Sequence, residues 1–216
     1  MGISAADIKQ LRERTNAPMM DCKKALTEVD GDMDKAVEFL RKKGLAGAKK
    51  RAGRIAAEGA VGSYIHGEGR IGVMVEVNCE TDFVARTDGF KKLVHEIAMQ
   101  IAASAPLYVS SEDVPQADIE KEKEIRSAQL KDQGKPDKII PKILEGQIKK
   151  WFTEICLMEQ AYNRDRDKSI TDLCNDLSAS TGEKISVRRF ARYELGEGME
   201  KRSNDLGNEV ADMIKG

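Results

Sequence analysis

The sequence contains few of the residues on which several protein classes depend. Its 216 residues include two histidines, one tryptophan and four cysteines, and aromatic side chains make up 5% of the total. No apolar run is long enough for a signal peptide or a membrane span, so we expect a soluble, cytoplasmic protein without a membrane partner. The formal net charge of −1 gives no global attraction to phosphate backbones, and we predict no direct contact with nucleic acid.

The scarcity of histidine and cysteine also argues against a metal site and against catalysis. A metal site needs several ligands at matched spacing, and neither His66 nor His95 has a cysteine beside it, so both are interpreted as surface histidines. No Ser-His-Asp or Cys-His arrangement can be argued from spacing, and we expect no cofactor and no enzymatic activity. The cysteines form no C-x-x-C pair and are typical of buried thiols in a reducing compartment: Cys22, Cys79, Cys156 and Cys174.

One glycine motif gives an alternative. The segment Gly67-Glu68-Gly69-Arg70-Ile71-Gly72 matches G-x-G-x-x-G, the spacing of dinucleotide-binding loops. That motif works where a helix begins at the glycines and directs its N-terminus at a pyrophosphate. Here an alternating, strand-like run follows, so the glycines predict a hairpin turn. A nucleotide-dependent enzyme that uses this segment would bind NAD or ATP directly.

The first 45 residues predict a domain of three short helices. Ser4 and Asp7 form a capping box before the first helix, and Pro18 suits the first turn of the second. Gly44 is expected to end the third. The apolar stripe of the second helix consists of Met19, Cys22, Leu26 and Val29.

Residues 46–57 form a basic, Gly/Ala-rich linker, and we place the domain boundary there. Strands are expected near 58–66, 70–77 and 184–195, and helices near 89–103, 115–133 and 137–155. The third strand is expected to hold one apolar face, made of Ile185, Val187, Ala191, Tyr193 and Leu195. Without regular βαβ alternation, the fold class is α+β: a three-helix domain, a core (58–195) with a three-stranded antiparallel sheet packed with helices, and a C-terminal helical tail (196–216).

Residues 70–90 are the most informative stretch of the chain. A half-buried strand leads into a short turn, which Thr81 or Asp82 can cap, and a strongly amphipathic helix follows from Phe90. The turn either directs Phe83 outward, which suits the pocket of a partner, or lets it tuck under the sheet as most phenylalanines do. The spacing alone does not decide between the two.

Met20 is a second candidate contact. It lies off the apolar stripe of its helix and beside Lys23, so we expect it to be exposed. An exposed, flexible thioether next to cations suits a partner surface, but for Met20 taken alone incidental exposure is the better explanation.

The segment Asn78-Cys79-Glu80-Thr81-Asp82-Phe83-Val84-Ala85 resembles the signature of elongation factor Ts, the family of exchange factors for the translation GTPase elongation factor Tu. The likeness extends over the chain. Residues 11–15 and 19–26 resemble the ubiquitin-associated-like (UBA-like) domain of the family, and residues 195–201 resemble the start of its C-terminal module. Asn16, Pro18 and Pro141 depart from the family pattern. The length is similar to the short form, with one core unit and no inserted coiled-coil arm, which is associated with homodimers.

This resemblance implies a function and a set of contacts. The chain would bind elongation factor Tu·GDP, displace Mg²⁺ and promote GDP release during translation elongation. The contacts that it implies are Thr81, Asp82, Phe83 and Val84 for the Mg²⁺-displacing loop, Met19, Met20 and Lys23 for the N-terminal domain, and Leu206, Val210 and Met213 for the C-terminal module. The alternative is an adaptor that binds small domains through residues 1–45 and has no effect on nucleotide release.

Overall fold

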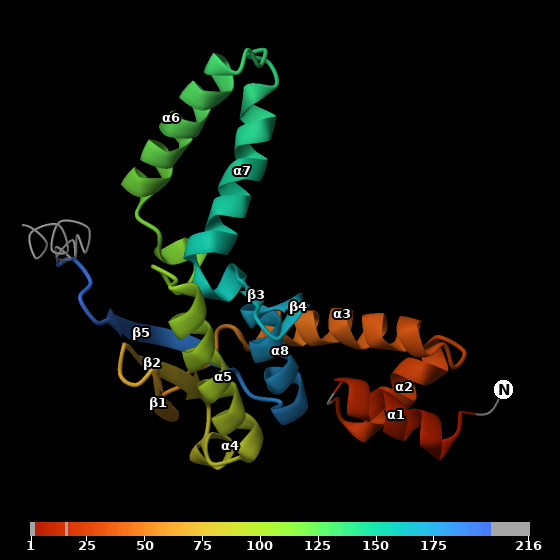
Figure 1. The fold of residues 1–216 in the computed structure, drawn as a ribbon. Coiled ribbons are helices and arrows are strands. Elements are labelled where there is room, and N and C mark those ends of the chain that lie inside the picture. Colours follow the sequence, from red (N-terminus) through yellow and green to blue (C-terminus); the bar gives the residue numbers. More distant parts are fainter. Residues whose placement is uncertain (1–2, 16, 200–216) are drawn as a thin grey trace, which may run out of the picture.

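The computed structural model describes residues 3–15 and 17–199. Figure 1 shows three parts: an N-terminal group of helices, a central sheet with helices packed on it, and a pair of helices that rises away from the sheet. The fold is therefore mixed α and β, as the sequence predicted. Asn16 and the predicted C-terminal contacts Leu206, Val210 and Met213 lie outside the described residues.

The N-terminal module consists of α1 (Ala5–Thr15), α2 (Met19–Glu28) and α3 (Met33–Arg51). The predicted capping box is confirmed, because the Asp7 amide donates to Ser4 Oγ over 3.1 Å and the Ser4 amide donates to Asp7 Oδ2 over 3.0 Å. Asp32 caps α3 by accepting from the amides of Asp34 and Lys35. The three helices enclose a core of Leu11, Ala17, Cys22, Ala25, Leu26, Ala36 and Leu40.

The prediction that Gly44 ends the third helix is wrong. Helix α3 continues to Arg51, so only residues 52–57 of the expected linker lack regular structure. Residues 46–51 contain alanine, lysine and arginine, which favour helix. Tertiary packing adds to this preference, since a Cβ at Gly44 would lie 3.8 Å from Cβ of Ala179 on α8 (Ile170–Thr181), an ordinary contact distance.

The central sheet is antiparallel in the order β1-β2-β5, with strands β1 (Glu58–His66), β2 (Ile71–Cys79) and β5 (Ser186–Glu194). All three predicted strands are present. The turn between β1 and β2 has positive φ at Gly67 (59°) and Gly69 (92°), backbone that glycine adopts without strain. A strand follows these glycines, which confirms the hairpin interpretation of the G-x-G-x-x-G motif.

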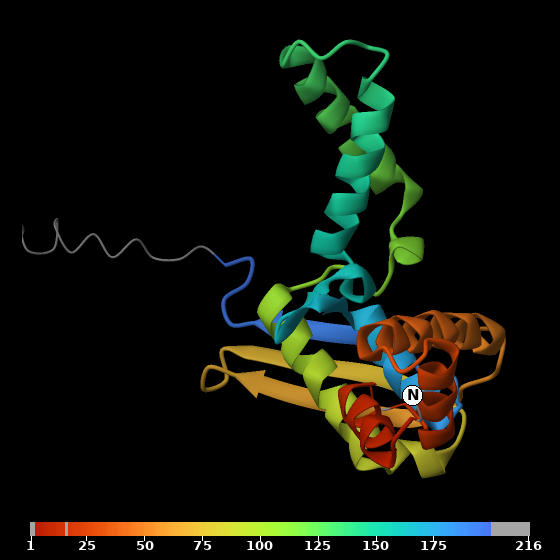
Figure 2. The same ribbon diagram turned by 90° about the vertical axis from the view of Figure 1, so that its right-hand side faces the viewer.

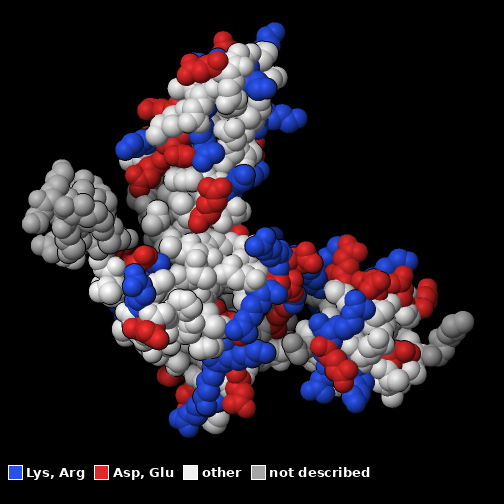
Figure 3. All heavy atoms as spheres, viewed as in Figure 1, with Lys and Arg blue, Asp and Glu red and all other residues white. Residues whose placement is uncertain are grey.

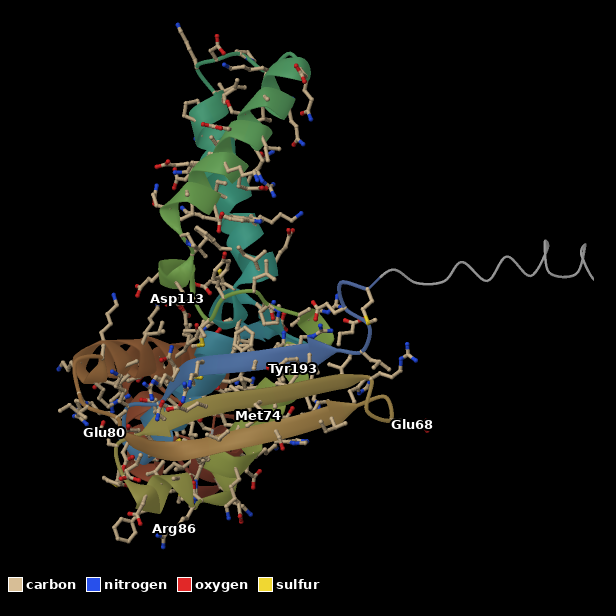
Figure 4. All side chains as sticks on the ribbon, turned by 90° about the vertical axis from the view of Figure 1, so that its left-hand side faces the viewer. Glu68, Met74, Glu80, Arg86, Asp113 and Tyr193 are labelled. Carbon is tan, nitrogen blue, oxygen red and sulfur yellow. The ribbon has the colours of Figure 1, made fainter. Side chains whose placement is uncertain are left out.

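Helices α5 (Asp88–Ser104) and α8 lie against one face of the sheet. The core between these layers contains Phe90, Ile97 and Ile101 of α5 together with Val73, Val75 and Val77 of β2. Within residues 3–15 and 17–199, no helix covers the other face of the sheet, which faces the viewer in Figure 4, where Met74 and Tyr193 are labelled. Met74 is 55% exposed and Tyr193 is 72% exposed.

The expectation of one apolar face along the third strand is wrong beyond Val187. Glu76 pairs with Arg189 whereas Val77 pairs with Val187, so Arg188 is an extra residue in β5. An extra residue reverses the side to which the following residues point. Phe190 therefore joins the core, and three residues of the expected apolar face are exposed instead: Ala191, Tyr193 and Leu195.

The bulge also brings two consecutive arginines to one carboxylate. Arg188 Nη1 donates to Glu76 Oε1 over 2.9 Å and Arg189 Nε donates to Glu76 Oε2 over 2.7 Å. Hydrogen bonds from Arg188 and then Arg189 hold the pKa of Glu76 below its ordinary value. A single carboxylate therefore pairs with both arginines of this bulge.

A helical hairpin corrects the expectation that no arm is inserted. Helices α6 (Gln116–Asp132) and α7 (Ile140–Ile155) pack on each other and extend away from the sheet (Figures 1 and 2). Pro141 lies in the first turn of α7, where proline costs no intrahelical hydrogen bond. The apolar residues of α7 cover α6 rather than the sheet; Leu130, Ile140 and Ile148 are buried there.

Short elements connect the hairpin to the core. They are the 3-10 turns Ser111–Asp113 and Leu157–Glu159, and a small ribbon of β3 (Ala161–Tyr162) with β4 (Asp165–Ser169). Sequence reasoning missed this ribbon because its strands are too short for an alternating pattern. Ser169 and Asp172 then form the capping box of α8.

Candidate protein-binding turn

The predicted turn lies between the end of β2 and the start of α5. Helix α4 (Asp82–Ala85) is a single turn, and Thr81 is its N-cap: the backbone is extended there (φ −129°, ψ 153°) and Oγ1 accepts from the Val84 amide over 3.4 Å. The cap is thus Thr81 and not Asp82, whose Oδ2 instead lies 2.8 Å from Arg86 Nη2. Thr87 caps α5 in the same way, by accepting from the Phe90 amide over 3.3 Å.

Phe83 projects from this turn into solvent. Its side chain is 78% exposed, which settles the choice that the sequence left open. Its neighbours Val84 and Ala85 are half-buried and pack on the core beneath the sheet. The turn is therefore anchored by two caps and by apolar contacts on one side, while none of the residues that the structure describes encloses the aromatic ring on the other side. Large apolar side chains in such a position suit the pocket of another protein.

The position of the turn within the sheet is also defined. In Figure 4, Glu80 lies at the end of β2 opposite to Glu68 of the hairpin turn, and Arg86 lies just below it. Cys79 is buried and donates to the Thr81 carbonyl over 3.1 Å, so it belongs to the frame of the turn. Burial, with the nearby carboxylate of Glu183, raises the pKa of the Cys79 thiol.

Sequence reasoning missed one residue that contacts the turn directly. Glu183, just beyond the end of α8, accepts hydrogen bonds from the backbone of Glu80 and Thr81 and from the Thr81 hydroxyl. About a hundred residues of chain separate the partners, and a single glutamate in a Gly-Glu-Lys segment carries no signal of such a contact. Only the tertiary fold brings them together.

The second predicted surface lies on the N-terminal module. Met20 is 73% exposed and Lys23 is exposed, as expected. Met19 was placed on the buried stripe, but it is 48% exposed, because it is the first residue of α2 and only the later residues Cys22 and Leu26 are enclosed. The N-terminal module and α4 both lie at the end of the molecule away from the α6–α7 hairpin (Figures 1 and 2).

Basic side chains are concentrated on the surface near the end of the molecule where α4 lies. Figure 3 shows a band of Lys and Arg that runs over the core toward the end where α4 lies. The chain as a whole is nearly neutral, with a formal net charge of −1, so this band is a local feature. A local positive band favours an acidic surface on a partner.

The two histidines do not form a metal site. Both are exposed; His66 Nδ1 lies 3.1 Å from the hydroxyl of Tyr64, and the His95 ring meets the Tyr64 ring edge-on at 5.6 Å. Within residues 3–15 and 17–199, no group of three or more His, Cys, Asp or Glu has a geometry that could hold a metal ion. The helices in these same ranges are too short or too polar to cross a membrane.

A cavity of about 210 Å³ lies beside Tyr64, between α5 and the β3–β4 ribbon. On its wall the Tyr162 hydroxyl donates to Glu96 Oε2 over 2.6 Å, and Arg164 Nη1 lies 3.1 Å from Glu96 Oε1. Burial, followed by the bond to Glu96, raises the pKa of Tyr162 to about 12. The buried carboxylate is thus fully paired, and the arrangement braces the ribbon against α5.

Fold and site together define a class: an α+β protein that presents a capped, outward-pointing aromatic turn at one end of a small antiparallel sheet. Comparison with known proteins gives the family. The family model described as Elongation factor TS matches residues 45–197. This chain belongs to the elongation factor Ts family.

The curated relatives named Elongation factor Ts extend the match to nearly the whole chain. The protein of Desulforamulus reducens is 60% identical over 213 residues, covering 99% of this chain and 98% of the relative. That of Moorella thermoacetica is 61% identical over 197 residues (91% and 97%), and that of Geobacter sulfurreducens is 58% identical over 211 residues (98% of each). The chain therefore has a role in translation elongation.

Proposed function

We propose that this protein is a guanine nucleotide exchange factor that binds elongation factor Tu·GDP and promotes GDP release. The observation that carries the proposal is the exposure of Phe83 on a turn that is rigid on every other side. Phe83 inserts between helices of the GTPase domain, and the resulting shift displaces Mg²⁺ and loosens the site of the β-phosphate. Thr81, Asp82 and Val84 complete the loop that presents it.

Two further contacts belong to the proposal. The exposed Met19, Met20 and Lys23 dock the N-terminal module on the same GTPase domain, and the C-terminal residues Leu206, Val210 and Met213 make a third contact. The basic band of Figure 3 supports association with an acidic surface. A buried aromatic anchor typically carries about 2–4 kcal/mol of binding on truncation, and we expect a contribution of this size from Phe83.

The proposed exchange needs no covalent chemistry, because it follows from linkage. A factor that weakens GDP binding by a given ratio is itself bound more weakly, by the same ratio, when GDP is present. Incoming nucleotide therefore expels the factor and completes the cycle. The proposal places this non-enzymatic cycle in the cytoplasm, where translation occurs.

We also propose that the protein is a homodimer whose copies meet through the open face of the sheet. Paired positions point to the same side, so this face carries rows such as Ile65–Gly72–Tyr193 and Ser63–Met74–Ala191. The face is apolar at its centre, and Glu76 with its two arginines lies at one end. A two-fold axis sets like residues against like, and two sheets pack face to face at about 10 Å.

The experiment is release of fluorescent GDP from purified elongation factor Tu. We expect strong acceleration by the wild-type chain and a loss of roughly 30-fold or more with Phe83→Ala, the equivalent of about 2 kcal/mol. Ile125→Ala is the matched control, since it truncates an exposed apolar residue of α6, outside the turn and off the sheet. No acceleration by the wild type would refute the exchange function, and binding without acceleration would favour the adaptor. Full activity of Phe83→Ala would refute the wedge alone.

A further inference from the structure

We propose that Glu183 is the positioning residue of the turn at residues 81–85, which we call the exchange turn. Its carboxylate fixes the cap residue Thr81 and thereby sets the direction in which Phe83 points. This inference rests on the proposed exchange function and adds a residue to its machinery. Glu183 does not itself lie on the turn, and it would act only through the backbone and side chain that it holds.

The first argument is that Glu183 accepts three hydrogen bonds from two consecutive residues. Its Oε2 lies 3.1 Å from the amide nitrogens of both Glu80 and Thr81, and its Oε1 lies 2.6 Å from Thr81 Oγ1. Hydrogen bonds to an ionised acceptor are stronger than neutral ones. The two amides precede α4 and have no acceptor in its short ladder, so Glu183 supplies what the helix cannot.

The second argument concerns the orientation of the Thr81 hydroxyl. Because this hydroxyl donates its proton to Glu183, its lone pairs are directed toward the Val84 amide, which donates to it over 3.4 Å. The cap of α4 therefore depends on Glu183 for its geometry. A helix of a single turn has little stability of its own, so the cap decides how Phe83, two residues further on, is presented.

The third argument is that Glu183 is itself held at a fixed place. Its carbonyl accepts from Ser178 Oγ over 2.6 Å, and Ser178 Oγ also accepts from Arg51 Nε of α3 over 3.0 Å. The next residue, Lys184, donates its amide to Glu80 Oε1 over 2.6 Å and its Nζ to the carbonyl of Ala52 over 2.7 Å.

These contacts join the end of α3, the end of α8 and the start of the turn in one network. The N-terminal module, which carries Met20, continues into α3. Glu183 is therefore placed so that both proposed contacts with the GTPase, Met20 and Phe83, are presented from one connected frame. An aromatic held in its binding direction avoids part of the entropy cost of ordering on association.

The test uses the full chain with Glu183→Ala, Glu183→Gln and the double variant Glu183→Ala/Phe83→Ala. The control is Asp176→Ala, which removes another carboxylate of α8, one that pairs with Lys168 and not with the turn. GDP release is measured against elongation factor Tu·GDP concentration, to separate kcat from KM. Amide hydrogen exchange at Glu80 and Thr81 is measured on the free protein.

We expect Glu183→Ala to lower kcat by roughly ten-fold or more with KM nearly unchanged, because the N-terminal contact is intact. The double variant should be no slower than Phe83→Ala alone, Glu183→Gln should retain more activity than Glu183→Ala, and Asp176→Ala should match the wild type. The Glu80 and Thr81 amides should exchange at least about ten-fold faster in Glu183→Ala.

Three results would overturn the inference: wild-type kcat in Glu183→Ala, losses that add in the double variant, or unchanged exchange of the two amides. Each leaves the exchange function itself standing. Failure of the wild-type protein to accelerate GDP release refutes the exchange function instead, and the amide measurement then still decides whether Glu183 holds the turn.

Discussion

Gly62 of β1 faces α5 at a place with no room for a side chain. A Cβ added there would overlap Cγ1 of Val94, a buried residue of α5. Valine is stiff about χ1 in a helix, so this methyl group cannot rotate away, and either α5 or β1 must shift. Helix α5 begins three residues after the exchange turn, so its seating on the sheet also sets the position of Phe83.

The expected cost of Gly62→Ala follows from overpacking. Inserting a methyl group into a well-packed core typically destabilises by about 1–3 kcal/mol. For a chain of this size each kcal/mol lowers the melting temperature by roughly 2–4 °C, so we expect a decrease of about 2–12 °C. The preference for alanine over glycine in a strand, roughly 0.5–1 kcal/mol, acts in the opposite direction and places the expected decrease in the lower part of this range.

Gly146 provides the matched control because the same substitution should there have the opposite sign. It lies inside α7, is exposed, and a Cβ added to it would meet nothing within 4 Å. Gly146→Ala should therefore stabilise the helix by about 0.8–1 kcal/mol. Both variants are measured by thermal and urea denaturation followed by circular dichroism at 222 nm. Gly62→Ala with a stability equal to or above the wild type would refute the packing of α5 on β1 described above.

Three other variants and conditions test separate features. Met74→Glu places a charge at the centre of the open sheet face and should convert the proposed dimer to a monomer in light scattering; a variant that elutes as the wild type contradicts that interface. Burial raises the pKa of Asp172, but hydrogen bonds from Ser169 and from Arg41 outweigh burial and leave the pKa lowered. The contribution of the ionised Asp172 to the free energy of unfolding is therefore present above the unfolded-state pKa of about 3.9 and is lost as pH falls below that pKa. Asp172→Asn should weaken this acid dependence in urea midpoints measured from pH 6 to 3, and an unchanged slope argues against the ion pair. Burial raises the pKa of Cys156 and Cys174 to about 12, so iodoacetamide at pH 8 should label them only in urea, and rapid native labelling contradicts their burial.

The parts of the fold that sequence reasoning predicted are those governed by local chemistry. The Ser4–Asp7 capping box, the β1–β2 hairpin and the switch from strand to helix near Phe90 depend on residues within a few positions of one another. Thr81 as a possible cap belongs to the same group. Periodicity also predicted the ends of the three strands to within two residues, because each strand has a buried and an exposed side over at least part of its length.

The errors arise where distant segments decide the outcome. Arg188 is an extra residue only because of how β5 pairs with β2, and no pattern within 184–195 shows it. Helix α3 runs past Gly44 because α8 packs beside it. In each case the outcome depends on which distant segment packs against or pairs with the element, and the helix or strand propensity of its own residues does not determine this.

The turn at 81–85 combines a local and a non-local cause, and this explains why its shape was predictable but its rigidity was not. Exposing Phe83 forgoes about 1.5–3 kcal/mol that burial of its ring would contribute to folding. A turn free to rearrange would recover that energy by tucking the ring against the core. The caps at Thr81 and Thr87 and the three bonds to Glu183 oppose this rearrangement together. The exposed ring is therefore a property of the whole frame, and loss of Glu183 alone should be enough to let the ring leave its outward position.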